Sequence, residues 1–101
     1  LAARDDMTEE ALALRLAEDP TLSDVARGEL LELACAKRGH RLRGYLALAE
    51  DPGVPLLLRA RAAARACDYL RFRKDATAVV RIDALVAAGI PVDAQALAAA
   101  R

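Results

Sequence analysis

Apolar residues recur along this chain with the period of an α-helix. The clearest stripe, spaced i, i+3, i+4 and i+7, consists of Leu42, Tyr45, Leu46 and Ala49. Four residues at this spacing lie on one side of a helix and can be buried together. Similar segments follow one another along the chain, and short linkers separate them. The pattern therefore predicts an all-α fold of about five to six helices.

Residues that start and stop helices set the expected bounds. The oxygen-bearing N-cap candidates are Thr8, Ser23, Asp75 and Asp93. Pro20 closes the first helix, and Pro55 suits the first position of the fourth. Gly39 is expected to end the second helix in the left-handed conformation, and Gly89 to end the fifth. We expect helices at about 8–18, 23–38, 41–50, 55–72, 75–89 and 93–101.

The core is expected to consist of small aliphatic side chains, because the chain has 25 alanines and 17 leucines but only three aromatic residues. The inward row of the fourth helix is predicted to be Leu56, Ala60, Ala63, Cys67 and Leu70. The inward row of the fifth is predicted to be Val79, Ile82 and Val86. Because the linkers are short, sequential helices should pack as antiparallel neighbours.

The sequence also contains an internal repeat. Residues 14–20 match residues 46–52 at six of seven positions, and both stretches end in Ala-Glu-Asp-Pro. The same offset of 32 also pairs Arg27 with Arg59, Ala34 with Ala66, Cys35 with Cys67 and Arg41 with Arg73. A weaker third copy pairs residues 53–55 with residues 89–91. A fixed period of this size is typical of stacked supersecondary units.

The repeat predicts one domain over residues 1–101. Its first repeat covers about 8–39, its second about 40–73, and a partial third about 75–101. The expected architecture is a set of antiparallel helical hairpins, stacked as a short right-handed α-solenoid or a compact bundle.

Residues 51–66 (Asp-Pro-Gly-Val-Pro-Leu-Leu-Leu-Arg-Ala-Arg-Ala-Ala-Ala-Arg-Ala) resemble the short HEAT-like helical repeats. In that family an Asp-Pro turn leads into a helix with an apolar-Arg pair and then small alanines at the packing seam. The matching positions here are Leu58, Arg59, Ala62, Ala63 and Ala66. The first copy keeps Asp19 and Pro20 but has Gly-Glu-Leu-Leu after Arg27. The resemblance implies a helical scaffold that binds other proteins.

A second resemblance is to ankyrin repeats, on residues 34–40 and 87–95. The Thr-Pro-Leu-His turn of that family is missing, and the fourth helix is too long for an ankyrin hairpin. Ankyrin therefore ranks second, although it also implies a protein-binding scaffold.

Charge is segregated along the chain, although the net charge is zero. Residues 1–36 carry a net charge of −6, and residues 37–81 carry +7. This asymmetry bears on partners, and it permits head-to-tail self-association. No apolar run approaches the ~20 residues of a membrane span, so a soluble chain is expected. Arginine outnumbers lysine 13 to 2, which favours a high-GC bacterial source, and Leu1 in place of a methionine favours a piece of a longer protein.

Candidate catalytic chemistry is sparse. His40 is the only histidine and is interpreted as a helix-end residue. Cys35 and Cys67 are interpreted as small buried residues in a reducing compartment, with the bacterial cytoplasm favoured. The Glu-Asp-Pro stretches at 18–20 and 50–52 are explained by helix ends. We therefore expect no catalytic residues, no metal and no cofactor.

The most suggestive feature is a basic cluster around the fourth helix. Its candidate partner-binding residues are Arg59, Arg61, Arg65, Arg71, Arg73 and Lys74. The leading prediction is a non-catalytic module that binds an acidic protein partner through this basic face. Nucleic acid is the alternative, disfavoured by the neutral total charge and the shortage of aromatic residues. A structural segment of a larger bacterial protein, such as a secreted effector, is a third hypothesis.

Overall fold

The computed structural model describes residues 8–101, which form six α-helices and no strand. The prediction of an all-α fold with five to six helices is confirmed. The helices are α2 (Glu9–Ala17), α3 (Asp24–Arg38), α4 (Leu42–Glu50), α5 (Leu56–Phe72), α6 (Ala76–Ala87) and α7 (Ala94–Ala100).

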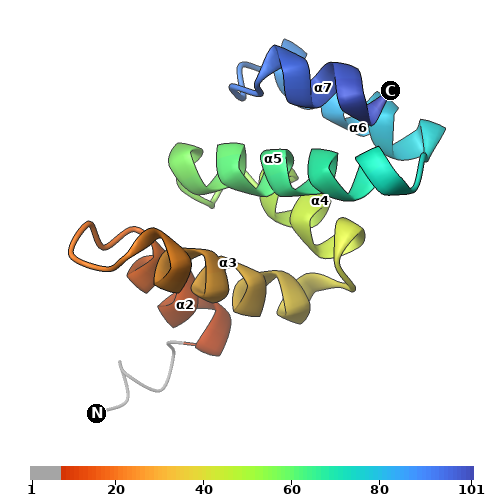
Figure 1. Cartoon of the computed structure of the whole chain (residues 1–101). Helices are drawn as coiled ribbons and strands as arrows, with labels where there is room; N and C mark the ends of the chain where they lie inside the picture. Colours follow the sequence, from red (N-terminus) through yellow and green to blue (C-terminus); the bar gives the residue numbers. More distant parts are fainter. Residues whose placement is uncertain (1–7) are drawn as a thin grey trace.

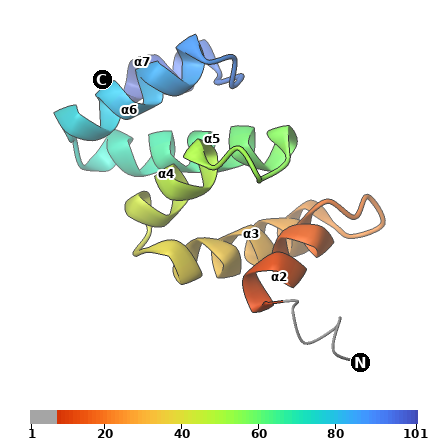
Figure 2. The same ribbon diagram turned by 180° about the vertical axis from the view of Figure 1, so that it is seen from behind.

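The helices lie in three layers, with α2 and α3 at one end, α4 and α5 in the middle, and α6 and α7 at the other end (Figures 1 and 2). Helix α2 packs on α3, and α4 packs on α5. Between layers, α3 lies on α4, α4 on α6, and α5 on α7. Helices α6 and α7 therefore differ from the first two pairs, because each packs more closely on the middle layer than on the other. The Cα atoms extend over 47 × 25 × 24 Å.

The predicted caps are confirmed, because each N-cap oxygen accepts a hydrogen bond from the backbone N–H three residues later. The bonds are Thr8 to Ala11 (3.0 Å), Ser23 to Ala26 (3.1 Å), Asp75 to Ala78 (3.1 Å) and Asp93 to Ala96 (3.1 Å). Gly89 ends α6 with a φ of 99°, as predicted. Side-chain chemistry at the caps thus fixes where the helices begin.

The matching stretches 14–20 and 46–52 have the same local structure. The Asp19 carboxylate accepts a hydrogen bond from the backbone N–H of Thr21 at 2.9 Å, and Asp51 accepts one from Gly53 at 2.8 Å. An offset of 32 places the first residue of α3 on the first residue of α5, and it places α2 within one residue of α4. The Asp-Pro stretches therefore act as turns at helix ends. Assignment of the two hairpins to a repeat family stays a prediction.

The largest fully buried side chains are Tyr45, Leu46, Leu48, Leu58, Cys67, Leu70 and Ile82. Two inward predictions are wrong, because Leu56 is 56% exposed and Val86 is 39% exposed. Three consecutive leucines begin α5, and the third of them, Leu58, continues the buried row of Ala62, Ala66 and Leu70 at a spacing of four. In α6, Leu85 is buried in place of Val86. The spacing of apolar residues identified these helices. It did not identify which residue is buried where neighbouring positions are equally apolar.

The turn between α3 and α4 differs from the prediction. Gly39 is extended, with φ 160°, and the left-handed φ belongs to Arg41 at 50°. A Cβ at Gly39 would lie 3.2 Å from the Gly44 backbone nitrogen, which is a tight contact. Gly44 lies still closer to α3, since a Cβ at Gly44 would lie 2.3 Å from the Cys35 carbonyl oxygen. Two glycines thus allow α4 to fold back directly onto the end of α3.

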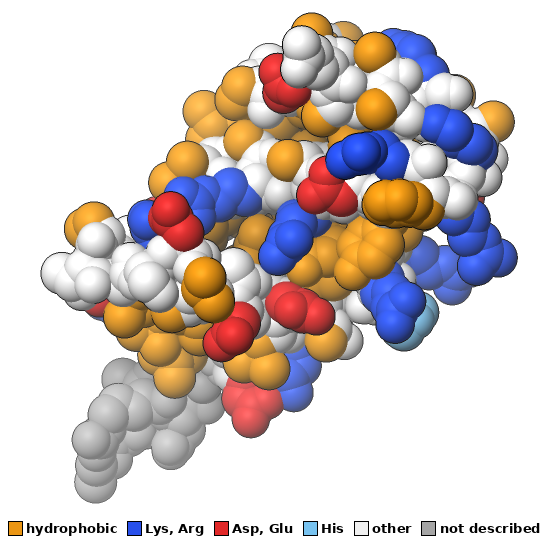
Figure 3. All heavy atoms as spheres, in the orientation of Figure 1, with side chains coloured by type: hydrophobic (Ala, Val, Ile, Leu, Met, Phe, Trp, Pro, Cys, Tyr) orange, Lys and Arg blue, Asp and Glu red, His pale blue; other side chains and the backbone are white. Residues whose placement is uncertain are grey.

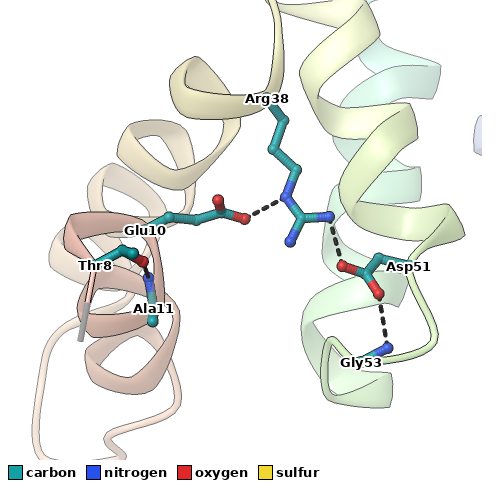
Figure 4. A network of polar contacts seen from close by, with 6 residues as sticks. All are labelled: Thr8, Glu10, Ala11, Arg38, Asp51 and Gly53. Atoms are coloured by element: carbon teal, nitrogen blue, oxygen red, sulfur yellow. Dashed lines mark hydrogen bonds and ion pairs between the residues drawn. The ribbon is translucent and has the colours of Figure 1, made fainter. Parts of the chain in front are cut away.

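Arg38 links the first two layers (Figure 4). Its guanidinium pairs with Glu10 of α2 and donates to Asp51 Oδ2 at 2.6 Å, in the turn after α4. All three side chains are largely shielded, with exposed fractions between 23% and 31%. The position 32 residues later is Leu70, which is fully buried. Arg38 of the first hairpin therefore makes polar contacts at the position where the second hairpin has the buried Leu70.

Candidate partner-binding site

The six predicted partner-binding cations do not form one surface. Arg59 is half-buried, and its Nε donates to the Ala49 carbonyl oxygen at 2.8 Å, so it covers the end of α4. Arg61 and Arg65 line a groove between α3 and α5. The Arg71 guanidinium lies 5.6 Å from the centre of the Phe72 ring. Arg73 and Lys74 line a second depression at the end of α5.

The second depression, here called the loop-end cleft, has a volume of about 480 Å³. It is lined by His40, Arg41, Leu42, Arg43, Tyr69, Arg73, Lys74 and Asp75. The α3–α4 turn provides one wall and the α5–α6 turn provides the other. Basic side chains gather around the single histidine at this end of the molecule (Figure 3). The fold thus brings together cations that lie about 30 residues apart in sequence.

Positive charge in the loop-end cleft is largely free of internal partners. The Asp75 carboxylate accepts the N-cap hydrogen bond of Ala78, and the Lys74 ammonium donates to the Ala99 carbonyl oxygen at 2.5 Å. Within residues 8–101, no ion pair involves Arg41, Arg43 or Arg73, and all three are exposed. An anionic group entering the cleft would therefore meet several cations without displacing an acid from them.

Tyr69 contributes the aromatic surface of the loop-end cleft. It is half-buried, and its ring centre lies 5.9 Å from that of Tyr45. Burial raises the pKa of Tyr45 to about 12, so its hydroxyl stays protonated at neutral pH. The Tyr69 ring thus provides apolar surface beside the arginine side chains of the cleft.

A pocket of about 390 Å³ adjoins the cleft and shares His40, Arg41 and Tyr69 with it. Cys35 lies on its wall, and its thiol donates to the Arg41 carbonyl oxygen at 3.3 Å. Burial raises the pKa of the Cys35 thiol, and the same cause raises the pKa of Cys67. Both cysteines are free and buried, as predicted, and stay protonated at neutral pH. Cys35 thus helps to hold the turn that carries Arg41.

The groove between α3 and α5 has a volume of about 260 Å³ and a mainly apolar floor that includes Leu31 and Leu58. Arg27, Arg61 and Arg65 lie on its walls. Arg27 pairs with Asp24 through Nη2, whereas its buried Nε has no partner among the described residues. This groove is separate from the loop-end cleft.

Arg41, Arg43, His40 and Tyr69 were missed as site residues by the sequence analysis. The signal was present, because Arg41 and Arg73 are 32 residues apart and occupy equivalent places in the repeat. Equivalent positions of adjacent stacked hairpins lie close together, so this match is a signal in the sequence that these arginines are neighbours. The predicted cluster consists of residues on and just after the fourth helix, and it does not include the α3–α4 turn.

Within residues 8–101, no group of three or more His, Cys, Asp or Glu side chains could hold a metal ion. No helix in this part of the chain is long and apolar enough to cross a lipid bilayer. Comparison with protein-family models, with curated proteins and with solved structures gave no match. The resemblance to HEAT-like repeats therefore rests on the residues quoted above.

Arg41 offers a direct test of the turn that shapes the cleft. Its φ of 50° and ψ of −110° match the first central position of a type II′ turn, which favours glycine. Arg41→Gly is therefore expected to raise the free energy of unfolding by about 1 kcal/mol, measured by urea denaturation. Arg43→Gly is the control, since it places glycine inside α4 and should lower stability by about 1 kcal/mol. A loss of stability in Arg41→Gly would contradict the strained turn.

Proposed function

We propose that this chain is a non-catalytic protein-interaction module that binds an acidic segment of another protein in the loop-end cleft. The observation that carries the proposal is the gathering around Tyr69 of exposed Arg41 from the α3–α4 turn, Arg43 from the start of α4 and Arg73 from the end of α5. Guanidinium groups pair bidentately with carboxylates, which gives both orientation and binding energy. Arginine and tyrosine are also the side chains most often responsible for affinity at protein interfaces.

The stacked hairpins support a scaffold role within this proposal. Two hairpins with matching turns and a resemblance to HEAT-like repeats fit a domain whose helices hold binding loops in fixed positions. The two buried free thiols are compatible with a reducing compartment, such as a bacterial cytoplasm. The proposed chemistry needs only oriented cations and an apolar support.

Nucleic acid is the competing ligand, since the same cations would also attract phosphates. The overall neutrality of the chain opposes it, as does the presence of only three aromatic residues. Salt dependence separates the two ligands. Duplex binding through phosphates must weaken steeply as salt rises, because condensed counterions are released from the nucleic acid.

Charge reversal in the loop-end cleft tests the proposal. A short fluorescein-labelled peptide rich in Asp and Glu serves as probe, with binding measured by fluorescence anisotropy. Arg43→Glu and Arg73→Glu are each expected to weaken binding about fivefold to tenfold, because a favourable charge contact becomes a repulsive one.

The control for these variants is Arg15→Glu, which makes the same change in net charge at an exposed site on α2. It should alter the dissociation constant by less than about twofold. Equal weakening by all three variants would show that only net charge matters and would overturn the cleft as the site. Tighter binding to a mixed-sequence DNA duplex than to the peptide would overturn the protein-binding proposal itself.

A further inference from the structure

The pocket that adjoins the loop-end cleft, here called the side pocket, has a volume of about 390 Å³. It shares His40, Arg41 and Tyr69 with the cleft. Its other lining residues come from the second half of α3, from the α3–α4 turn and from α4. Because three residues line both depressions, a ligand bound in the cleft can extend directly into the side pocket.

The inner wall of the side pocket is apolar. Cys35 and Tyr45 are each only 2% exposed, so the thiol and the phenol ring lie deepest. The Cys35 thiol already donates to the Arg41 carbonyl oxygen at 3.3 Å. Ala36 and Gly39 also line the pocket and add no polar side chain. The inner wall therefore offers a ring, a thiol and small residues, which suit an apolar group.

The charges that line the two depressions differ. Glu32 is exposed and lines the side pocket but not the loop-end cleft, whereas Arg41 lines both. The cations that line only the cleft are Arg43, Arg73 and Lys74. A carboxylate is therefore drawn to the cleft, and Glu32 disfavours it in the side pocket. An acidic segment gains most when its carboxylates lie in the cleft and an uncharged side chain lies in the side pocket.

Building on the function proposed above, we propose that the side pocket receives a large apolar side chain of the same acidic partner segment. The recognised sequence then combines carboxylates with a bulky apolar residue within two positions of them. In an extended segment, side chains two positions apart lie on one face, about 7 Å from each other. One carboxylate and one apolar side chain can therefore enter adjoining depressions together, with Tyr69 between them.

The apolar contact is expected to distinguish one acidic segment from another. Complete burial of a large apolar side chain lowers a dissociation constant by about tenfold or more. The side pocket is open to solvent on one side, so part of the inserted side chain stays in contact with water. We therefore expect a preference of about fivefold to tenfold over an equally acidic segment without the apolar residue.

Fluorescence anisotropy of the whole chain with two fluorescein-labelled peptides tests the proposal. Both peptides have the same length and the same Asp and Glu residues in a Gly-Ser background, and one has a central Ser replaced by Phe. The wild type should bind the Phe peptide about fivefold to tenfold more tightly. Ala36→Gln places a longer polar side chain in the side pocket from an exposed position of α3. It should reduce the preference to less than about twofold and leave binding of the Phe-free peptide unchanged.

The matched control is Ala84→Gln, the same substitution at an exposed position of α6 that lines neither depression. It should bind both peptides as the wild type does. Equal binding of the two peptides by the wild type would overturn the proposal, as would a preference that persists in Ala36→Gln. Weaker binding of the Phe-free peptide by Arg43→Glu and Arg73→Glu would still support the loop-end cleft in either case. Absence of binding by both peptides would overturn the proposed function, and this inference with it.

Discussion

Gly44→Ala is expected to lower the free energy of unfolding by about 3 kcal/mol. A Cβ at Gly44 would lie 2.3 Å from the Cys35 carbonyl oxygen and 2.7 Å from that of Gly39, both of them backbone atoms. Such a clash is relieved only if α4 moves away from α3, which disturbs the contact between the first two layers. Helix propensity alone predicts the opposite sign, since alanine is favoured over glycine by about 1 kcal/mol. Urea denaturation followed by far-UV circular dichroism measures the difference.

Gly28→Ala is the matched control, because Gly28 also lies inside a helix. Its nearest neighbour would be the Arg65 guanidinium at 3.6 Å, an ordinary contact with a flexible side chain. Helix propensity should therefore determine the effect of Gly28→Ala, and the free energy of unfolding should rise by about 0.5–1 kcal/mol. A gain of stability in both variants would show that α3 and α4 do not approach each other as described.

Arg38→Ala is expected to lower the free energy of unfolding by about 2 kcal/mol. The Arg38 guanidinium bridges Glu10 and Asp51 from separate layers, and its removal leaves two shielded carboxylates facing each other. Lys37→Ala removes the neighbouring pair with Glu9, whose side chains are 46% and 73% exposed. That control should change stability by no more than about 0.5 kcal/mol. Equal losses of stability in Arg38→Ala and Lys37→Ala, measured by thermal or urea unfolding, would contradict the role of Arg38 as a bridge.

The pH dependence of stability gives a second readout for Arg38. The Gly53 backbone N–H, with the Arg38 guanidinium, holds the pKa of Asp51 below its usual range. A lowered folded-state pKa contributes stability that is complete above the ordinary carboxyl pKa of about 4 and is lost as pH falls toward the lower value. As the pH falls from about 4 to the acid limit of folding, Arg38→Ala should therefore lose less stability than the wild type does.

Most of the fold followed from local signals in the sequence. The cap residues Thr8, Ser23, Asp75 and Asp93 fixed four helix starts, because their side chains satisfy backbone N–H groups that would otherwise lack partners. The inward faces were predicted less well. At Leu56 and Val86 the neighbouring residues are equally apolar, so only packing between layers decides which one is buried.

The α3–α4 turn could not be predicted from local propensity. The expected left-handed residue was Gly39, but the positive φ lies two residues later, at Arg41, where side-chain sterics disfavour it. The reason is tertiary, because α4 approaches the end of α3 so closely that Gly44 has no room for a Cβ and Gly39 has little. The basic site was missed because the predicted cluster followed the fourth helix and left out Arg41 and Arg43, which lie in this turn and at the start of α4.

Chemical-shift mapping tests the proposed binding site most directly. The ¹⁵N-labelled chain would be titrated with the unlabelled acidic peptide at low salt, and its backbone amide resonances followed by NMR. The largest shifts are expected at His40, Arg41, Arg43, Tyr69, Arg73 and Lys74, with little change at Arg15 or along α2. Unchanged spectra, or shifts concentrated outside the loop-end cleft, would contradict the account.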